Sequence, residues 1–152
     1  MIERYEMFPE EAMEIRKEVF VEEQGFEDEF DEIDAGCIHL VAFDGEKAVG
    51  TCRIFYDDRK ASYLLGRLAV RKHWRGKGVG SRLLEEAEKV VAEKGGRSLM
   101  LHSQCAASEF YEKNGYQKMG EIELEQGCPH IWMGKRICRA NMAAGFYMPL
   151  PT

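Results

Sequence analysis

The stretch RGKGVGSRLLEEAEK, residues Arg75 to Lys89, places three glycines on alternate positions directly before a helix pattern. Apolar residues recur behind the glycines at the 3.6-residue spacing of one helical face. They are Val79, Leu83, Leu84, Ala87, Val90 and Val91. Because glycine costs a helix about 1 kcal/mol relative to alanine, three of them at a helix start serve a purpose other than helix formation.

The glycines and their charged neighbours indicate an anion-binding loop. A helix N-terminus leaves backbone N–H groups unpaired and carries partial positive charge. Glycines there let a phosphate approach the backbone, because no Cβ stands in the way. Residues 71–82 also hold five lysines and arginines and no acid. The alternative interpretation is a tight turn within a solvated basic loop, but backbone, dipole and side-chain charge all favour phosphate binding.

Two common phosphate motifs are absent from this stretch. A P-loop requires GxxxxGK[ST], which does not occur here. A dinucleotide fingerprint, GxGxxG, would start at Gly76 and place its third glycine at Ser81, and the preceding strands look antiparallel. The pattern that fits is R-x-x-G-x-G, Arg75 to Gly80, directly after the apolar strand GRLAV. A nucleotide-binding oxidoreductase is therefore disfavoured.

The order of the predicted elements indicates an α/β, or α+β, fold. A strand, a helix from Pro9 to Gly25, a hairpin around Asp44 and Gly45 and a third strand precede the glycine loop. After its helix come a buried strand, a short helix ended by Gly115 and a closing antiparallel pair. The order β-α-β-β-β-α-β-α-β-β predicts a mixed, mostly antiparallel central sheet flanked by helices.

Composition excludes several classes of protein. The 152 residues are 45% hydrophobic and 32% charged with a net charge of −6, which predicts one globular domain and disfavours partners such as nucleic acid or an anionic membrane. The N-terminus lacks the apolar region of a signal peptide, and no window is apolar enough to span a bilayer. Five scattered cysteines without a CxxC pair favour reduced thiols. We therefore expect a cytoplasmic protein.

Two separate motifs resemble the GNAT superfamily of acetyl-coenzyme A-dependent N-acetyltransferases. The R-x-x-G-x-G loop after an apolar strand resembles that family's pyrophosphate site, and SEFYEKNGY, Ser108 to Tyr116, resembles its short helix with a tyrosine and a following glycine-aromatic pair. The segments IRKEVFVEEQ, HLVAF, GRLAV, HSQ and GCPHIWM more narrowly resemble the small bacterial ElaA-type branch. The resemblance covers residues 1–137 as a single GNAT-like domain and leaves a C-terminal tail, 138–152.

The resemblance implies a binding site for acetyl-coenzyme A as the cosubstrate. The backbone of the glycine loop would hold the pyrophosphate with help from the side chains of Arg75 and Lys77. The end of the preceding strand would pair with the pantetheine amides, and a backbone N–H near Ala69 or Val70 would polarise the thioester carbonyl. The implied residues are Leu68, Ala69, Val70, Arg75, Gly76, Lys77, Gly78, Val79, Gly80 and Ser81.

The same resemblance implies a general acid at Tyr111. A phenol with a pKa of about 10 keeps its proton at neutral pH and can donate it to the departing thiolate. The alternative is that Tyr111 packs in the core beside Phe110, as aromatic residues at helical spacing usually do.

The general base is less clear in the sequence. Candidates are Glu23, His39, His102 and His130. A lone histidine is more often a structural residue than a catalytic one. We favour His130, because it lies in the branch-like segment GCPHIWM.

Two further patterns have competing interpretations. Cys37 with His39, and Cys128 with His130, each put two potential ligands on one strand face, but both segments look like ordinary strands, so no metal is expected. The acidic stretch 22–34 is either a solvated loop or a negatively charged surface that attracts a cationic acceptor.

The sequence thus predicts an N-acetyltransferase that transfers an acetyl group to a primary amine of a small-molecule acceptor by direct attack. A non-catalytic acyl-coenzyme A-binding sensor is the alternative, since it would keep the glycine loop and dispense with Tyr111. The identity of the acceptor is left open, as is assembly into a homodimer.

Overall fold

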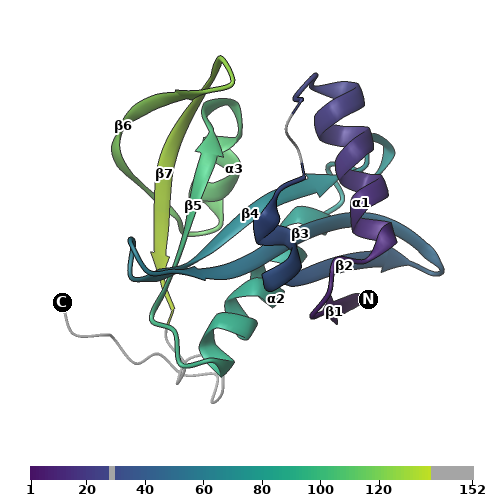
Figure 1. Ribbon diagram of the computed structural model, residues 1–152, viewed down its shortest axis with the longest axis horizontal. Coiled ribbons are helices and arrows are strands. Elements are labelled where there is room, and N and C mark those ends of the chain that lie inside the picture. Colours follow the sequence, from purple (N-terminus) through teal and green to yellow (C-terminus); the bar gives the residue numbers. More distant parts are fainter. Residues whose placement is uncertain (28–29, 138–152) are drawn as a thin grey trace. The chain divides into compact units, whose positions relative to one another are not determined.

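A computed structural model describes residues 1–27 and 30–137 of the chain (Figure 1). The expected C-terminal tail, 138–152, lies outside the described residues. The chain divides into two compact units, which are described in turn. The first holds residues 1–55 and 65–87, and the second holds residues 56–64 and those from 88 onward.

The strands of the first unit follow one another across the sheet in sequence order. They are β1 (Ile2–Tyr5), β2 (Ile38–Asp44), β3 (Lys47–Asp57) and β4 (Ser62–Val70), the last two continuing into the second unit. β1 pairs with β2, and β2 with β3, in antiparallel register. Gly45 has a φ of 62° in the turn between β2 and β3, which confirms the predicted hairpin.

Helix α1 (Glu10–Arg16) runs directly into a π-helical segment, η1 (Lys17–Glu23), and Gly25 with a φ of 80° follows. The predicted helix is therefore confirmed, although its second half has π rather than α geometry. Its buried face packs against the sheet, as the ribbon of α1 across these strands shows (Figure 1). The buried residues of the resulting hydrophobic cluster are Ala12, Ile15, Val19, Phe20, Val41 and Ala69.

Helix α2 (Val79–Glu93) begins in the first unit and packs closely against β3. A Cβ added at Gly50 of β3 would lie 2.9 Å from Cγ1 of Val79 and 3.1 Å from Cδ1 of Leu83. A side chain at position 50 would therefore push the helix away. All six residues of the predicted apolar stripe are buried, so the amphipathic pattern that follows the glycines is confirmed.

A buried ionic network fixes the short 3-10 helix η2 (Glu32–Gly36) within the first unit. Asp34 accepts hydrogen bonds from both terminal nitrogens of Arg16, at 2.7 and 3.1 Å, and from Nη1 of Arg53 at 2.9 Å. Asp31 caps η2 and also accepts from Arg53, at 2.6 Å. Burial alone would raise the pKa of Asp34, but hydrogen bonds from Arg16, the backbone of Asp31 and Arg53 lower it to about 2.

The second unit contains a three-stranded antiparallel sheet in the order β5-β7-β6. Its strands are β5 (Ser98–Gln104), β6 (Gln117–Glu125) and β7 (Cys128–Arg136). A 3-10 turn, η4 (Cys105–Ala107), leads into α3 (Ser108–Lys113), and Gly115 follows with a φ of 94°. The buried carboxylate of Glu88 accepts hydrogen bonds from the Tyr116 hydroxyl and from Nζ of Lys135, both at 3.0 Å.

The elements occur in the predicted order, and the expected class, a mostly antiparallel sheet flanked by helices, is confirmed. The short 3-10 and π segments are additions that the apolar periodicity did not indicate. Across residues 1–27 and 30–137, no helix combines the length and the apolar character needed to cross a membrane.

The four cysteines within the described residues are free thiols. Cys37 and Cys52 are buried, whereas Cys105 and Cys128 are partly exposed. Burial raises the pKa of Cys37 to about 11 and raises the pKa of Cys52 further still. The expectation of reduced thiols holds for these four; Cys138 lies outside the described part of the chain.

Candidate active site

The glycine loop leaves β4 at Val70, passes through a short 3-10 helix, η3 (Lys72–Trp74), and enters α2. Gly76 and Gly78 have φ values of 76° and 83°, a left-handed conformation that a residue with a Cβ adopts only with strain. Nothing lies within 4 Å of where a Cβ at Gly76 would stand. The backbone of the loop is therefore open to a ligand at this point.

The side chains of the loop divide between core and solvent. Val79 is buried against Gly50, whereas Arg75, Lys77 and Arg82 are exposed. Three positive side chains therefore stand around the start of α2, where the helix dipole is also positive. This arrangement suits an anion, as the sequence indicates.

Strand β4 carries a distortion just before the residues expected to meet the pantetheine. Arg67 has a φ of 51°, which costs a non-glycine residue on the order of 1–3 kcal/mol. Its guanidinium lies 3.3 Å from the carboxylate of Asp31, an ion pair that helps to hold the conformation. Beyond it, Ala69 is buried, while Leu68 and Val70 are only partly buried. Arg67 was not identified in the sequence, where nothing marks an arginine for a left-handed conformation.

Ion pairs join the loop to η1. Arg75 donates two hydrogen bonds to the carboxylate of Glu23, at 2.6 and 2.8 Å, and a third from Nε to the carbonyl oxygen of Val70 at 2.9 Å. Arg71 donates to Glu18 at 2.9 Å. The hydrogen bond from Arg75 lowers the pKa of Glu23, which makes Glu23 a weaker proton acceptor than an ordinary glutamate.

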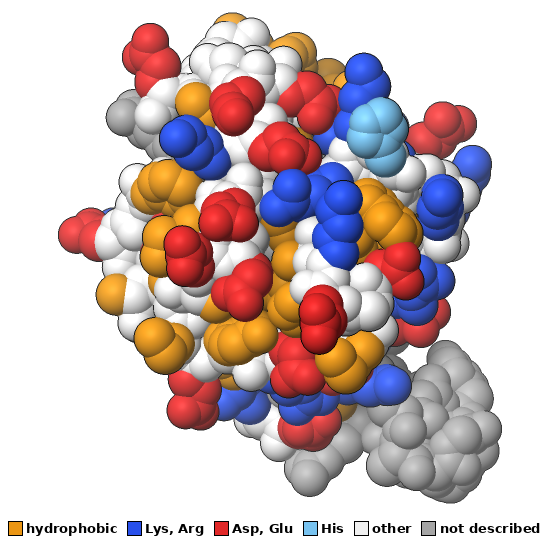
Figure 2. Space-filling view, turned by 90° about the vertical axis from the view of Figure 1, so that its right-hand side faces the viewer, with side chains coloured by type: hydrophobic (Ala, Val, Ile, Leu, Met, Phe, Trp, Pro, Cys, Tyr) orange, Lys and Arg blue, Asp and Glu red, His pale blue; other side chains and the backbone are white. Residues whose placement is uncertain are grey.

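A cleft of about 450 Å³ lies beside these ion pairs. Acidic residues of η1 line one part of it and basic or aromatic residues of η3 line another. Its lining comprises Glu18, Glu22, Glu23, Lys47, Arg71, Lys72, His73 and Trp74. On the face drawn in Figure 2, acidic and basic side chains are likewise interleaved, rather than gathered into one large patch of either sign.

The acidic stretch 22–34 has mixed roles in the structure. Glu23 is paired with Arg75, and Asp31 and Asp34 belong to the ionic network around η2. Asp28 and Glu29 lie outside the described residues. A role for this stretch in attracting a cationic acceptor stays a prediction, and it cannot rest on these three paired acids.

Tyr111 lies on α3 in the second unit and is 8% exposed. Its ring meets those of Phe110 and Tyr116 edge to face, with centroids 5.1 and 6.1 Å apart. These contacts match the packing interpretation, and they involve the ring rather than the hydroxyl. General acid catalysis by Tyr111 stays a prediction.

His102 and His130 lie next to each other in the second unit, with ring centroids 4.9 Å apart. Nδ1 of His130 lies 2.8 Å from the carbonyl oxygen of Cys128. Since a carbonyl only accepts, this nitrogen carries hydrogen, and Nε2 of a neutral ring keeps its lone pair. Burial lowers the pKa of His102. The negative charges of Glu125 and Glu123 raise this pKa, whereas the charges of His130 and Lys60 lower it. A lowered pKa makes His102 a weaker proton acceptor than an ordinary histidine.

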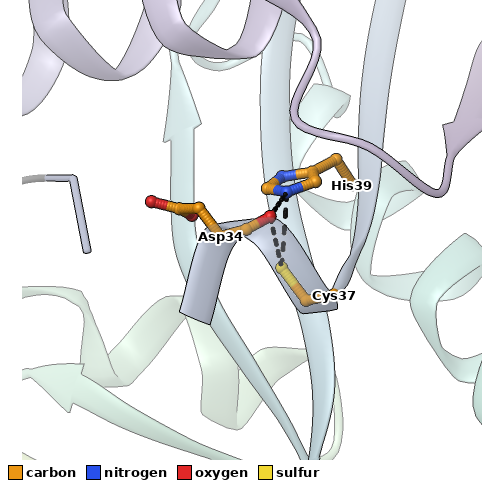
Figure 3. A group of neighbouring side chains, drawn as sticks. All are labelled: Asp34, Cys37 and His39. Atoms are coloured by element: carbon orange, nitrogen blue, oxygen red, sulfur yellow. Dashed lines mark hydrogen bonds between the residues drawn. The ribbon is translucent and has the colours of Figure 1, made fainter. Parts of the chain in front are cut away.

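His39 is fully buried in the first unit and stacks on Phe8 with centroids 4.7 Å apart. Its Nε2 lies 2.9 Å from the backbone carbonyl of Asp34 and 3.3 Å from Sγ of Cys37 (Figure 3). Burial lowers the pKa of His39, so the ring is neutral near pH 7. Lacking contact with solvent, His39 is better explained as a structural residue than as the base.

The same three residues place potential metal ligands within 4.8 Å of one another. The carboxylate of Asp34, however, points away from Cys37 and His39 in Figure 3. It is engaged by Arg16 and Arg53, whose positive charges oppose a bound cation. We assign no metal to this cluster.

Comparison with known proteins identifies the family. Residues 6–137 match the family described as the acetyltransferase (GNAT) domain. The chain belongs to the GNAT family of acetyltransferases. YjcF of Bacillus subtilis, named an uncharacterised N-acetyltransferase, is 39% identical over 128 residues, which are 82% of this chain and 90% of YjcF.

Solved GNAT structures share the fold. Escherichia coli ElaA has a TM-score of 0.79 at 21% identity, covering 89% of this chain and 99% of ElaA. An aminoglycoside 6'-N-acetyltransferase complexed with coenzyme A has a TM-score of 0.75 at 20% identity, covering 100% of this chain and 99% of the other. The match to the family and to YjcF confirms the expected family and its enzyme class, and the resemblance to ElaA is confirmed at the level of the fold.

Proposed function

We propose that this GNAT-family chain transfers the acetyl group of acetyl-coenzyme A directly to the primary amine of a small-molecule acceptor in the cytoplasm. The observation that carries the proposal is the loop after β4. Two glycines in left-handed conformation, three exposed basic side chains and the start of α2 meet within eight residues, Arg75 to Arg82. Such an arrangement fits the pyrophosphate of the cosubstrate.

The remaining cosubstrate contacts follow from the strand before the loop. Leu68, Ala69 and Val70 come directly after the distortion at Arg67, and their backbone would pair with the pantetheine amides as a further strand would. A backbone N–H near Ala69 or Val70 would stabilise the oxyanion that forms when the amine attacks the thioester. The complex of a fold relative with coenzyme A supports this choice of cosubstrate.

Two proton transfers complete the reaction. The attacking amine must lose a proton, and we assign its acceptance to Nε2 of His130, whose other ring nitrogen is fixed by the carbonyl of Cys128. The departing thiolate must gain a proton, and we assign its donation to the hydroxyl of Tyr111.

The alternative is a non-catalytic acyl-coenzyme A sensor, which would use the same loop. Both proteins would bind coenzyme A, so binding alone does not separate them. The deciding experiment is an acetylation screen over primary amines, polyamines and aminoglycosides, with release of free thiol as the signal. Turnover of any amine supports the enzyme, whereas tight coenzyme A binding without turnover across the screen supports the sensor.

A further inference from the structure

The three strands of the second unit gather one set of side chains on one face. In register, His102 of β5 lies opposite Trp132 of β7, and His130 of β7 lies opposite Glu123 of β6. Glu125 lies opposite Cys128, two residues before His130. Residues directly opposite in a sheet, and residues two apart along a strand, share a face. Two histidines, a tryptophan and two glutamates are therefore neighbours.

The rings of this face form a continuous aromatic surface, which already contacts a primary ammonium group. His102 stacks on Trp132 with centroids 4.7 Å apart, and the His130 ring is 4.9 Å from that of His102. Nζ of Lys60 lies 4.1 Å from the centroid of Trp132. An ammonium at that distance is attracted by the negative face of the ring.

The glutamates place negative charge beside this surface. An oxygen of Glu125 lies 3.3 Å from Nε2 of His130, and an oxygen of Glu123 lies 3.6 Å from Nε2 of His102. Both glutamate side chains are more than half exposed, at 60% for Glu123 and 52% for Glu125. Nε2 of His102 is buried and has no hydrogen-bond partner among the described residues.

In the neutral form of His130, these contacts leave acceptors without a donor. When His130 is neutral, its Nε2 lone pair faces the carboxylate of Glu125, and neither group supplies a hydrogen. A primary ammonium carries three N–H donors and one positive charge. It could donate to the carboxylate and the imidazole while its charge lies against the rings.

We propose that this face of β5, β6 and β7 binds the primary ammonium group of the amine acceptor, with Lys60 as an internal occupant that the acceptor displaces. Identifying the ligand as the acceptor rests on the proposed function, and the binding site itself does not. An anion would meet two carboxylates here. The ammonium of Lys60 on the ring of Trp132 indicates an organic cation in preference to a metal ion.

Tryptophan fluorescence can test binding directly, without coenzyme A. The background is Trp74→Phe, which leaves Trp132 as the sole tryptophan, excited selectively over the tyrosines, and EDTA is present throughout. The probes are butylammonium and butyltrimethylammonium, which share a charge but differ in N–H donors. We expect saturable quenching by butylammonium and at least ~10-fold weaker binding of the quaternary ion, because it keeps the cation–π contact and loses its hydrogen bonds.

Removing the internal cation and removing a carboxylate should change butylammonium affinity in opposite directions, and each variant has a matched control. Lys60→Met should tighten butylammonium binding at least ~3-fold, because an internal competitor lowers apparent affinity. Lys118→Met removes the same charge from the opposite face of β6 and should not tighten butylammonium binding. Glu125→Gln should weaken binding about 10-fold, a plausible loss for a charge-assisted hydrogen bond, whereas Glu112→Gln, an exposed acid on α3, should leave it unchanged.

Equal binding of the two ions would overturn the proposal. So would equal effects of each variant and its control, or quenching that appears only when EDTA is replaced by zinc. Amine binding without acetyl transfer would contradict the proposed function while supporting this site. Acetyl transfer with the same acceptor KM in Glu125→Gln and the parent would overturn this site while leaving the proposed function intact.

Discussion

Asp34 keeps a negative charge in a buried place because two guanidinium groups surround it. Its folded pKa of about 2 is below the ordinary value for an aspartate, so its ionised form stabilises the fold at pH values above that ordinary value, near 4. That stabilisation is lost as the pH falls through about 2, because the protonated carboxyl no longer balances Arg16 and Arg53.

We predict that Asp34→Asn lowers the free energy of unfolding by about 3–5 kcal/mol, the usual cost of leaving a buried charge without its partner. Urea titration at pH 7 provides the measurement. Glu32→Gln, an exposed acid in the same 3-10 helix, is the matched control and should change stability little. If the two variants unfold at the same urea concentration, the network around η2 contributes no stability.

At Tyr111, packing and catalysis predict different results for the removal of one oxygen. Tyr111→Phe keeps the ring contacts with Phe110 and Tyr116. As a general acid, its hydroxyl should supply roughly 10²-fold or more of kcat, with little effect on coenzyme A affinity. Single-turnover kinetics must show that chemistry limits the rate. A variant within twofold of the parent would assign Tyr111 to packing and favour the sensor.

Gly78 offers a test of the backbone loop, with a control for strain. Its φ of 83° means that any added Cβ strains the chain, and that Cβ would lie 3.0 Å from Nη1 of Arg82. Gly45 has a φ of 62° with nothing within 4 Å, so Gly45→Ala introduces similar strain far from the loop in sequence. We expect coenzyme A affinity, measured by calorimetry, to fall at least ~10-fold in Gly78→Ala, equivalent to about 1.4 kcal/mol. An equal loss in both variants would attribute the effect to strain.

At the scale of elements, the ion pairs between η1 and the loop couple coenzyme binding to the helix before it. Glu23 holds the guanidinium of Arg75, which the resemblance assigns to the pyrophosphate. Glu23→Gln should release Arg75 and remove a negative charge from the cleft. Coenzyme A affinity should therefore rise about threefold at low salt, and less above 0.1 M, where the screening length is about 10 Å.

The matched control for Glu23→Gln is Glu14→Gln, an exposed acid on α1. Calorimetry at two salt concentrations measures both variants. Weaker binding in Glu23→Gln would mean that Glu23 positions Arg75 for the ligand rather than competing with it.

Structural features whose causes lie close together in the sequence were predictable, and those formed by distant residues were not. The stripe on α2 and the Asp44–Gly45 hairpin were predictable because their cause lies within a few residues. The Arg16–Asp34–Arg53 network was not, because its members lie 18 and 19 residues apart and no local pattern relates them. The π-helical geometry of η1 also escaped prediction, since one buried face is compatible with both kinds of helix.

The candidate site also has a part that was predictable from neighbouring residues and a part that was not. The glycine loop is contiguous, so its glycines and charges could be read together. His102 and His130 were each identified singly as candidate bases, but their contact with each other and with Trp132 depends on strand register. Glu123 and Glu125 join them only because β6 pairs with β7. Register is set by the whole sheet, and the sequence of one strand does not contain it.

For the molecule as a whole, the rate at which the buried thiol of Cys52 is alkylated reports how often the chain unfolds. The thiolate form of a cysteine is what attacks an alkylating reagent, and Cys52 is 1% exposed with a raised pKa, so its labelling must wait for the chain to open. Cys105 and Cys128, being partly exposed, should react first and serve as internal references. A ligand that binds only the folded state slows such labelling by a factor of 1 + [L]/Kd when closing is fast. Mass spectrometry of Cys52 labelling would then measure coenzyme A affinity in the absence of any acceptor, and a rate that coenzyme A leaves unchanged would argue against its binding.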